Sequence, residues 1–403
     1  MDVFDRVMAY NAGREPERLQ MKLAAMQANP FTFLRGTCHL FYEDWHTSLN
    51  QFKSPSAWVC GDCHLENFGT YKGDNGLVYF DLNDFDECAL APCLWELIRL
   101  LTSLILAAKT LKLNESQTDK MLNEMLTRYA QTLATGKPKW VERKTAKGMV
   151  KRLLTDLNGR TQKDFLASRT EWRGGKLALA VDGKRALKLS KAKKAVALDL
   201  FKNSMQVSNK TDFYYPLDIA RRVAGTGSLG VERYVVLIEG DKGKHRLIDM
   251  KKTGASALSP YLSIKQTKWH NEAYRVSTIQ SHSQAMPPAL LKPTYDPDNA
   301  YLIKELQPTQ DRLNLSLWNG KLNKLDNVFE TMAEIVAWSH LRNAAYLKAD
   351  TREVLMRFGA DVELWKTQSI DIAKEAANET VRQWLEYKKA YATNLKKNFS
   401  SKR

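Results

Sequence analysis

The spacing of apolar side chains predicts helices at both ends of the chain. In residues 3–28, apolar positions recur three and four residues apart, and Pro16 fits a break near the start of the segment. Asn29 and Pro30 then end this pattern. A helical periodicity returns from residue 323 to about residue 397. We therefore expect both terminal regions to be helical.

Short apolar runs predict strands in two other regions. Residues 57–61 and 77–82 are bounded by Gly, Asp and Asn, which is typical of a buried strand pair flanking a polar loop. Residues 231–239, 246–251 and 299–306 are rich in β-branched and apolar side chains and are separated by turn residues. We expect these last three runs to form a small antiparallel sheet.

The stretch between these two regions, residues 92–201, has a mostly helical pattern with a glycine-containing break at residues 173–176. Its most apolar part, residues 94–108, is interrupted by Glu96 and Arg99 and is shorter than the roughly 20 apolar residues that cross a bilayer. We therefore expect a core helix there and no membrane span.

This order of elements predicts an α+β protein of two lobes. A chain of 403 residues is also longer than most single hydrophobic cores. We assign residues 1–210 to a helical lobe with the polar loops, residues 211–312 to a small β-rich lobe, and residues 313–403 to a helical segment that completes the large lobe.

The net charge of +16 is concentrated in residues 137–194, where eighteen Lys and Arg accompany five Asp and Glu. Such a surplus attracts nucleic acid, anionic lipid or phosphorylated ligands without selecting among them. A basic run is also typical of a solvated helical face. The segment therefore leaves an anionic partner open, and a nucleic-acid or membrane-surface binder is one alternative function.

The N-terminus and the cysteines favour a cytoplasmic protein. Charged residues begin at Asp2, so the first residues lack the apolar region of a secretory signal. Five cysteines, an odd number in a chain of this length, do not favour a disulfide framework. We expect reduced thiols.

The most informative polar loop, residues 60–69, reads Cys-Gly-Asp-Cys-His-Leu-Glu-Asn-Phe-Gly. Kinases use an Asp that orients the acceptor hydroxyl, an Asn five residues later that binds a metal, and a second Asp after the next strand. Asp62, Asn67 and Asp81 follow this order. The loop lets the first two side chains converge, and a hairpin would return Asp81 beside them.

The same loop contains the pattern Cys60-x-x-Cys63-His64, which also occurs at haem c attachment sites and in zinc or redox motifs. Haem attachment in most settings requires an exported chain, and a tetrahedral zinc site would need two further ligands. The candidates for those ligands are Cys38, His39, Cys88 and Cys93. A Cys/His metal protein is therefore a further alternative.

A second polar motif, residues 221–230, holds the spacing Gly-x-Gly-x-x-Gly directly before the apolar run 231–239. In a dinucleotide fold this motif opens a helix, whereas before a strand it is typical of the glycine hairpin that covers ATP phosphates in kinases. The candidate phosphate-binding positions are Gly225, Gly227, Ser228 and Gly230. Lys251 on the next strand would neutralise the phosphates, although an exposed strand lysine is the alternative reading.

Together these segments resemble the bacterial family called domain of unknown function 2252, which is itself similar to the aminoglycoside phosphotransferase and protein-kinase superfamily. The matching segments are residues 30–36, 60–69, 80–87, 95–97, 223–240, 301–306 and 339–342. The resemblance implies a kinase-like fold of two lobes. It also implies a circularly permuted chain order, because the catalytic loop precedes the glycine loop.

The resemblance implies a phosphotransferase that uses ATP and magnesium. Asp62 would be the catalytic Asp, and Asn67 and Asp81 would bind magnesium, with Asp84 as a further candidate. The glycines and Lys251 would hold the nucleotide. The acceptor remains unknown, and an ATP-binding pseudokinase or a nucleotidyl transferase would use the same pocket.

The sequence departs from the kinase-like pattern at several positions. Cys60 stands where phosphotransferases usually have His, and Glu96 stands where we expect Asp. Lys251 has no clear partner, because Glu272 lies at a plausible distance on a helical run but the family-like position after Val276 holds Ser277 and Thr278. Residues in the matching motifs that also suit a purely structural role are Arg35, His64, His340 and Arg342.

Overall fold

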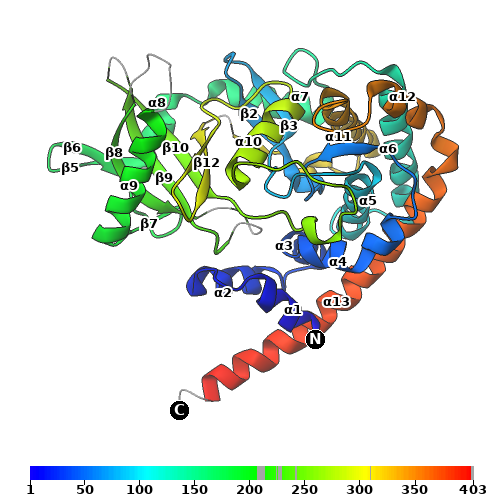
Figure 1. The fold of residues 1–403 in the computed structure, drawn as a ribbon, viewed down its shortest axis with the longest axis horizontal. Helices are drawn as coiled ribbons and strands as arrows, with labels where there is room; N and C mark the ends of the chain where they lie inside the picture. The colour runs from blue at the N-terminus through cyan, green and yellow to red at the C-terminus, as the bar shows by residue number, and fades with distance from the viewer. Residues whose placement is uncertain (207–213, 224, 226–228, 241–242, 309, 401–403) are drawn as a thin grey trace.

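The computed structural model describes residues 1–206, 214–223, 225, 229–240, 243–308 and 310–400, and it is the mixed α+β structure expected from the sequence (Figure 1). The helices are α1 (Val3–Tyr10), α2 (Pro16–Ala25), α3 (Pro30–Gly36), α4 (Cys38–Leu49), α5 (Leu94–Ala108), α6 (Glu115–Thr135), α7 (Gly148–Asp156), α8 (Gln162–Ala167), α9 (Lys191–Gln206), α10 (Glu272–Ser283), α11 (Leu322–Arg342), α12 (Arg352–Ala360) and α13 (Lys366–Ser400). The strands are β1 (Ser56–Val59), β2 (Phe68–Lys72), β3 (Val78–Leu82), β4 (Ala89–Pro92), β5 (Thr170–Arg173), β6 (Lys176–Leu179), β7 (Ala186–Leu187), β8 (Tyr215–Arg222), β9 (Arg233–Gly240), β10 (Lys244–Lys252), β11 (Lys292–Tyr295), β12 (Ala300–Leu306) and β13 (Asp311–Arg312).

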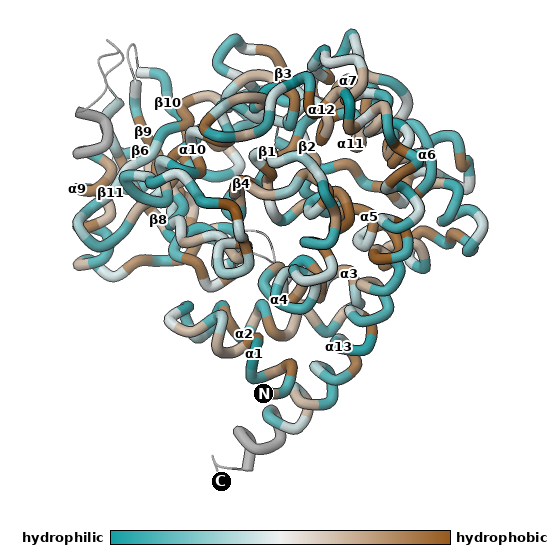
Figure 2. Tube along the Cα trace, turned by 45° about the vertical axis from the view of Figure 1, so that its right-hand side comes forward, coloured by the Kyte–Doolittle hydropathy of each residue, from teal (hydrophilic) through white to brown (hydrophobic). Residues whose placement is uncertain are grey.

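One part of the molecule is mainly helical and is built around α5. Almost every side chain of α5 is buried, including Leu94, Leu97 and Leu101, and the helix lies among α3, α4, α6 and α13. Figure 2 shows the hydrophobic stretches of α5 inside this part of the molecule. The core helix predicted for residues 94–108 is therefore confirmed. Within the described residues, no helix has the length and apolar character needed to span a membrane.

The other part is built on a six-stranded antiparallel sheet with the order β11-β12-β10-β9-β8-β7. On β10, Lys251 lies opposite Arg233 of β9 and Leu302 of β12. Helix α10 connects β10 to β11 and packs against β11 and β12, while α9 packs against β8 and β11. The three runs predicted to form a sheet correspond to β9, β10 and β12.

Three local predictions need correction. The helix expected over residues 3–28 is divided in two, because Pro16 takes the first position of α2, where the missing N–H of proline breaks no hydrogen bond. The break at residues 173–176 is the turn of the β5-β6 hairpin, where Gly174 and Gly175 both have positive φ. The expected strand pair does not form, since β1 pairs with β4 and β3 pairs with β2.

The basic segment 137–194 runs over α7, α8, the β5-β6 hairpin and the start of α9. Its Lys and Arg side chains are mostly exposed, and some of them pair with nearby acids, as Arg152 does with Asp156. The boundary expected at residue 211 lies outside the described residues, and α9, which precedes it, packs on the sheet. An anionic partner for this segment stays a prediction.

Candidate functional site

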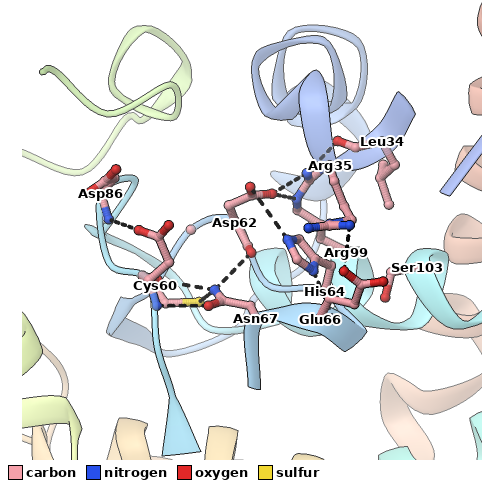
Figure 3. A network of polar contacts seen from close by, with 12 residues as sticks. Leu34, Arg35, Cys60, Asp62, His64, Glu66, Asn67, Asp86, Arg99 and Ser103 are labelled. Atoms are coloured by element: carbon pink, nitrogen blue, oxygen red, sulfur yellow. Dashed lines mark hydrogen bonds and ion pairs between the residues drawn. The ribbon is translucent and has the colours of Figure 1, made fainter. Parts of the chain in front are cut away.

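Asp62 lies in the loop after β1 and is held from one side by a buried arginine (Figure 3). Its Oδ1 accepts a 3.0 Å hydrogen bond from Nε of Arg99, whose Nη2 also donates to the backbone oxygen of Leu34 at 3.0 Å. Its other oxygen, Oδ2, lies 3.9 Å from Nε2 of His64. Gly61 makes this turn possible, because a Cβ there would lie 2.1 Å from the backbone oxygen of Glu87.

Asn67 connects this loop to the segment after β3. Its Nδ2 donates to the backbone oxygens of Asp62 and Asp84, each at 3.1 Å, and its Oδ1 accepts from the backbone N–H of Asp84 at 2.9 Å. A carbonyl oxygen has two lone pairs, so Oδ1 retains one acceptor site. Asn67 therefore places Asp84 beside Asp62 and keeps one oxygen lone pair for a ligand.

Asp81 does not join this group of side chains. It lies within β3 and is 3% exposed, and its Oδ2 accepts from the backbone N–H of Ala285 at 3.1 Å and lies 3.9 Å from Nη1 of Arg342. Burial is the main reason that the pKa of Asp81 is raised. Asp81 is thus held at Ala285 and does not line the cleft, whereas the carboxylates that line it together with Asn67 include those of Asp84 and Asp86.

Lys251 faces these two carboxylates from the sheet. Its Nζ lies 3.4 Å from Oδ2 of Asp84 and also pairs with Asp86. Burial raises the pKa of Asp84, but the charge of Lys251 and its cationic neighbours outweighs burial and holds that pKa at about 2. The expected partner Glu272 pairs instead with Nε of Arg275 at 2.5 Å. The partner of Lys251 is therefore the acidic segment after β3.

The glycine loop contributes one described residue to the same space. Gly225 lines the cleft that holds Asp62, Asn67 and Asp84, and Gly230 has φ of +87° and packs against Arg14. Gly227 and Ser228 lie outside the described residues. Two regions of the chain that are more than 100 residues apart thus share one cleft.

The volume of this cleft is about 180 Å³. The charged residues that line it are Arg14, Lys22, Arg35, Asp62, Glu66, Asp84, Asp86, Glu87 and Arg312. Acidic groups from the segment after β3 form one wall, and cations from the N-terminal helices and β13 form another.

Comparison with family models identifies the group of proteins to which the chain is related. Residues 14–390, nearly the whole chain, match the model described as "Uncharacterized protein conserved in bacteria (DUF2252)". The chain belongs to the DUF2252 family. Neither the curated proteins nor the solved structures gave a match.

Two residues of α5 that sequence reasoning did not assign to the site hold the polar loop 60–69 of this DUF2252 member. Oε2 of Glu96 accepts from the backbone N–H of Cys60 at 2.7 Å, and Oε1 lies 2.5 Å from Nε2 of His340. Arg99, three residues later, holds Asp62. The available signal was this pair of charges on one face of an otherwise apolar helix, because buried charges require partners.

The cysteines of this DUF2252 member do not gather around the motif as a zinc site would require. All five are buried and none forms a disulfide. Sγ of Cys60 and Sγ of Cys63 lie with a Glu96 oxygen within 4.8 Å of one another, whereas the other three cysteines do not join this group. Both Glu96 oxygens already hold the Cys60 N–H and His340, so a metal bound there would compete with these two contacts, and the Cys/His metal alternative stays a prediction.

Glu87 makes stability depend on pH. Burial is the main cause that raises its pKa to about 7, and the charges of Asp62 and Asp86 add to it. Because the pKa of Glu87 is higher in the folded chain, its protonated form stabilises the fold. This contribution to the unfolding free energy is complete below the unfolded pKa, near 4.3, and is lost as pH rises through about 7. The unfolding free energy should fall by roughly 1–3 kcal/mol between about pH 5 and pH 8, and Glu87→Gln should remove this part of the fall.

Urea denaturation of both proteins over this pH range measures the difference. The exposed Glu363→Gln variant is the control and should follow the wild-type curve. Parallel curves for the wild type and Glu87→Gln would show that Glu87 titrates as it does in the unfolded chain.

Proposed function

We propose that this protein transfers the γ-phosphoryl group of ATP to an acceptor hydroxyl with the help of magnesium. The observation that carries the proposal is the shared cleft, in which Gly225 of the glycine loop meets Asp62, Asn67 and Asp84 of the catalytic region. Kinases position ATP with glycine backbone, a lysine, an Asn and acidic side chains, all of which contact one ligand.

The order of elements in the sheet supports a kinase-like arrangement. The glycine loop joins β8 to β9, Lys251 lies on β10, and α10 follows before β11 and β12. In kinases the glycine loop, the lysine strand and a helix also follow in this order. The catalytic loop stands before these elements here, so we propose a two-lobed, circularly permuted kinase-like fold, in which the β12 segment 301–306 lies beside the adenine.

Asp84, Asp86 and Oδ1 of Asn67 would hold magnesium. All three offer oxygen atoms, which magnesium prefers, and two of them are carboxylates already gathered around a cation. Magnesium bound there would neutralise charge on the β- and γ-phosphates. In the absence of nucleotide, Lys251 neutralises the two carboxylates. When nucleotide binds, its ammonium group would also interact with the phosphates.

Asp62 would orient the acceptor. Arg99 holds Oδ1 and leaves Oδ2 toward the cleft, where it can accept a hydrogen bond from the acceptor hydroxyl. The acceptor oxygen would form a bond to the γ-phosphorus while the bond from that phosphorus to the β–γ bridging oxygen breaks. ADP then leaves, and the hydroxyl proton passes to Asp62.

Nucleotide binding can be tested through Lys251. ATP with magnesium should raise the melting temperature of the wild type, and Lys251→Met should abolish most of this rise because a buried point charge on the phosphates is lost. Lys252→Met is the matched control, since neighbouring side chains of a strand point to opposite faces. Equal shifts in both variants would remove Lys251 from the nucleotide site.

Labelled ATP tests the reaction itself. We expect the γ-label, in the presence of magnesium, to move to an acceptor in a small-molecule extract. Movement of the α-label would instead indicate nucleotidyl transfer. Binding without movement of either label would indicate a pseudokinase, and both of those results contradict the proposed phosphotransfer.

A further inference from the structure

The cleft has a basic wall that the proposed phosphoryl transfer does not need. Arg14 follows α1, Lys22 lies in α2, Arg35 lies in α3, and Arg312 ends β13. Figure 1 shows α1, α2 and α3 together beneath the two main parts of the molecule. These segments are separate in the sequence from the glycine loop and the catalytic loop. Their positive charges are therefore a further feature of the cleft, beyond the groups assigned to phosphoryl transfer.

Two guanidinium groups of this wall converge on one carboxylate. Nη1 of Arg35 lies 2.6 Å from Oε2 of Glu66, and Nη1 of Arg312 lies 3.6 Å from the same oxygen. Nε of Arg35 is buried, and it has no hydrogen-bond partner in the part of the chain that the structure describes. The pair therefore carries one positive charge more than Glu66 neutralises, and it has an unused donor.

Lys22 places a third cation in the wall. It is 2% exposed, and its Nζ donates to the neutral Oδ1 of Asn11 at 3.0 Å. Across the described ranges, no carboxylate lies within salt-bridge distance of it, and burial lowers its pKa. A buried ammonium without an anionic partner is costly, and an anion bound beside it would offset that cost.

Arg14 connects the basic wall to the glycine loop. Its Nη1 donates to the backbone oxygen of Leu229 at 2.8 Å, and its side chain packs against Gly230. Asp62 and His64 line the same cleft as this wall and Asp84, and Arg35 of the wall pairs with Glu66 in the loop of Asp62. A molecule held by the wall would thus lie next to the residue that orients the acceptor.

We propose that the basic wall binds a phosphate group of the acceptor, so that the acceptor is a phosphate-bearing small molecule with a hydroxyl directed at Asp62. This inference rests on the proposed function. Phosphate fits best among anions, because the planar fork of arginine matches its oxygens and two guanidinium groups converge at Glu66. Helices α2 and α3 line this side of the cleft, and we therefore favour a small molecule as the acceptor.

The test uses the whole chain saturated with magnesium and AMP-PNP, so that the nucleotide subsite is filled, and inorganic phosphate as the probe. Phosphate should raise the melting temperature beyond potassium chloride of equal ionic strength. Arg35→Gln and Arg312→Gln should each weaken the apparent phosphate affinity by about tenfold. The control Arg152→Gln, an exposed arginine of α7, should respond like the wild type.

Each other result of this experiment is also decisive. No phosphate effect, or an equal effect in all variants, overturns the inference. A phosphate effect that AMP-PNP abolishes shows that phosphate occupies the nucleotide subsite, which overturns the inference and leaves the proposed function intact. Failure of AMP-PNP itself to shift the wild type overturns the proposed function and this inference with it.

Discussion

Asp62→Asn should lower the rate of γ-phosphate transfer by about a thousandfold while changing the affinity for magnesium and AMP-PNP by less than about threefold. The amide cannot take the acceptor proton, but its oxygen can still accept from Arg99, so the loop keeps its shape. In the proposed arrangement, magnesium and nucleotide would contact other residues. Steady-state transfer of the γ-label and titration calorimetry measure the two quantities.

The control for this variant is Asp199→Asn, an exposed change on α9 that should leave both quantities unchanged. An Asp62→Asn protein that transfers phosphate at the wild-type rate would exclude Asp62 as the catalytic group. Loss of nucleotide binding together with transfer would instead assign Asp62 to the metal or to loop structure.

Glu96→Ala should lower the unfolding free energy by about 3–5 kcal/mol. The carboxylate is fully buried and joins the polar loop at Cys60 to α11 at His340, so its removal leaves the Cys60 N–H and Nε2 of His340 without these hydrogen bonds. His340 also bonds to Tyr129 at 2.8 Å, and the loss extends into α6. Urea denaturation measures the change.

Glu96→Gln should recover part of this loss, because the amide retains the shape and one acceptor oxygen. Asp156→Ala removes an exposed carboxylate whose pairing with Arg152 is worth less than about 1 kcal/mol, and it serves as the control. A Glu96→Ala protein as stable as this control would mean that the polar loop 60–69 is held by other contacts.

Local patterns in the sequence predicted much of the fold. The apolar periodicity gave the helix at residues 94–108, and β-branched runs gave three strands of the sheet, because burial and backbone preference act over a few residues. The same patterns missed β8 and β11 and joined α1 to α2. The pairing partner decides that β8 and β11 are strands, and a single proline separates α2 from α1.

The site was harder to predict where the direction of a side chain matters. Asp81 and Asp84 both follow the strand after Asn67, and the sequence favoured Asp81. Strand geometry decides between them, because Asp81 lies inside β3 and contacts Ala285, whereas Asp84 follows the strand end and is fixed by Asn67. Three residues along the chain thus separate a carboxylate held at Ala285 from one that lines the cleft.

Contacts between distant segments could not be predicted at all. Arg14 reaches the glycine loop from more than 200 residues away, and Arg35 and Arg312 meet at Glu66. Arg35 and Glu66 lie in segments that match the family, but nothing local in the sequence marks Arg14 or Arg312. Such convergence depends on how helices and sheet pack, which no short pattern records.

A crystal structure of the chain with magnesium and AMP-PNP tests most directly whether the glycine loop and the acidic segment after β3 bind one nucleotide. We expect the β- and γ-phosphates to lie between the backbone at Gly225 and the carboxylates of Asp84 and Asp86, with Lys251 in contact with a phosphate oxygen. A nucleotide bound elsewhere, with this cleft left empty, would contradict a shared phosphoryl-transfer site.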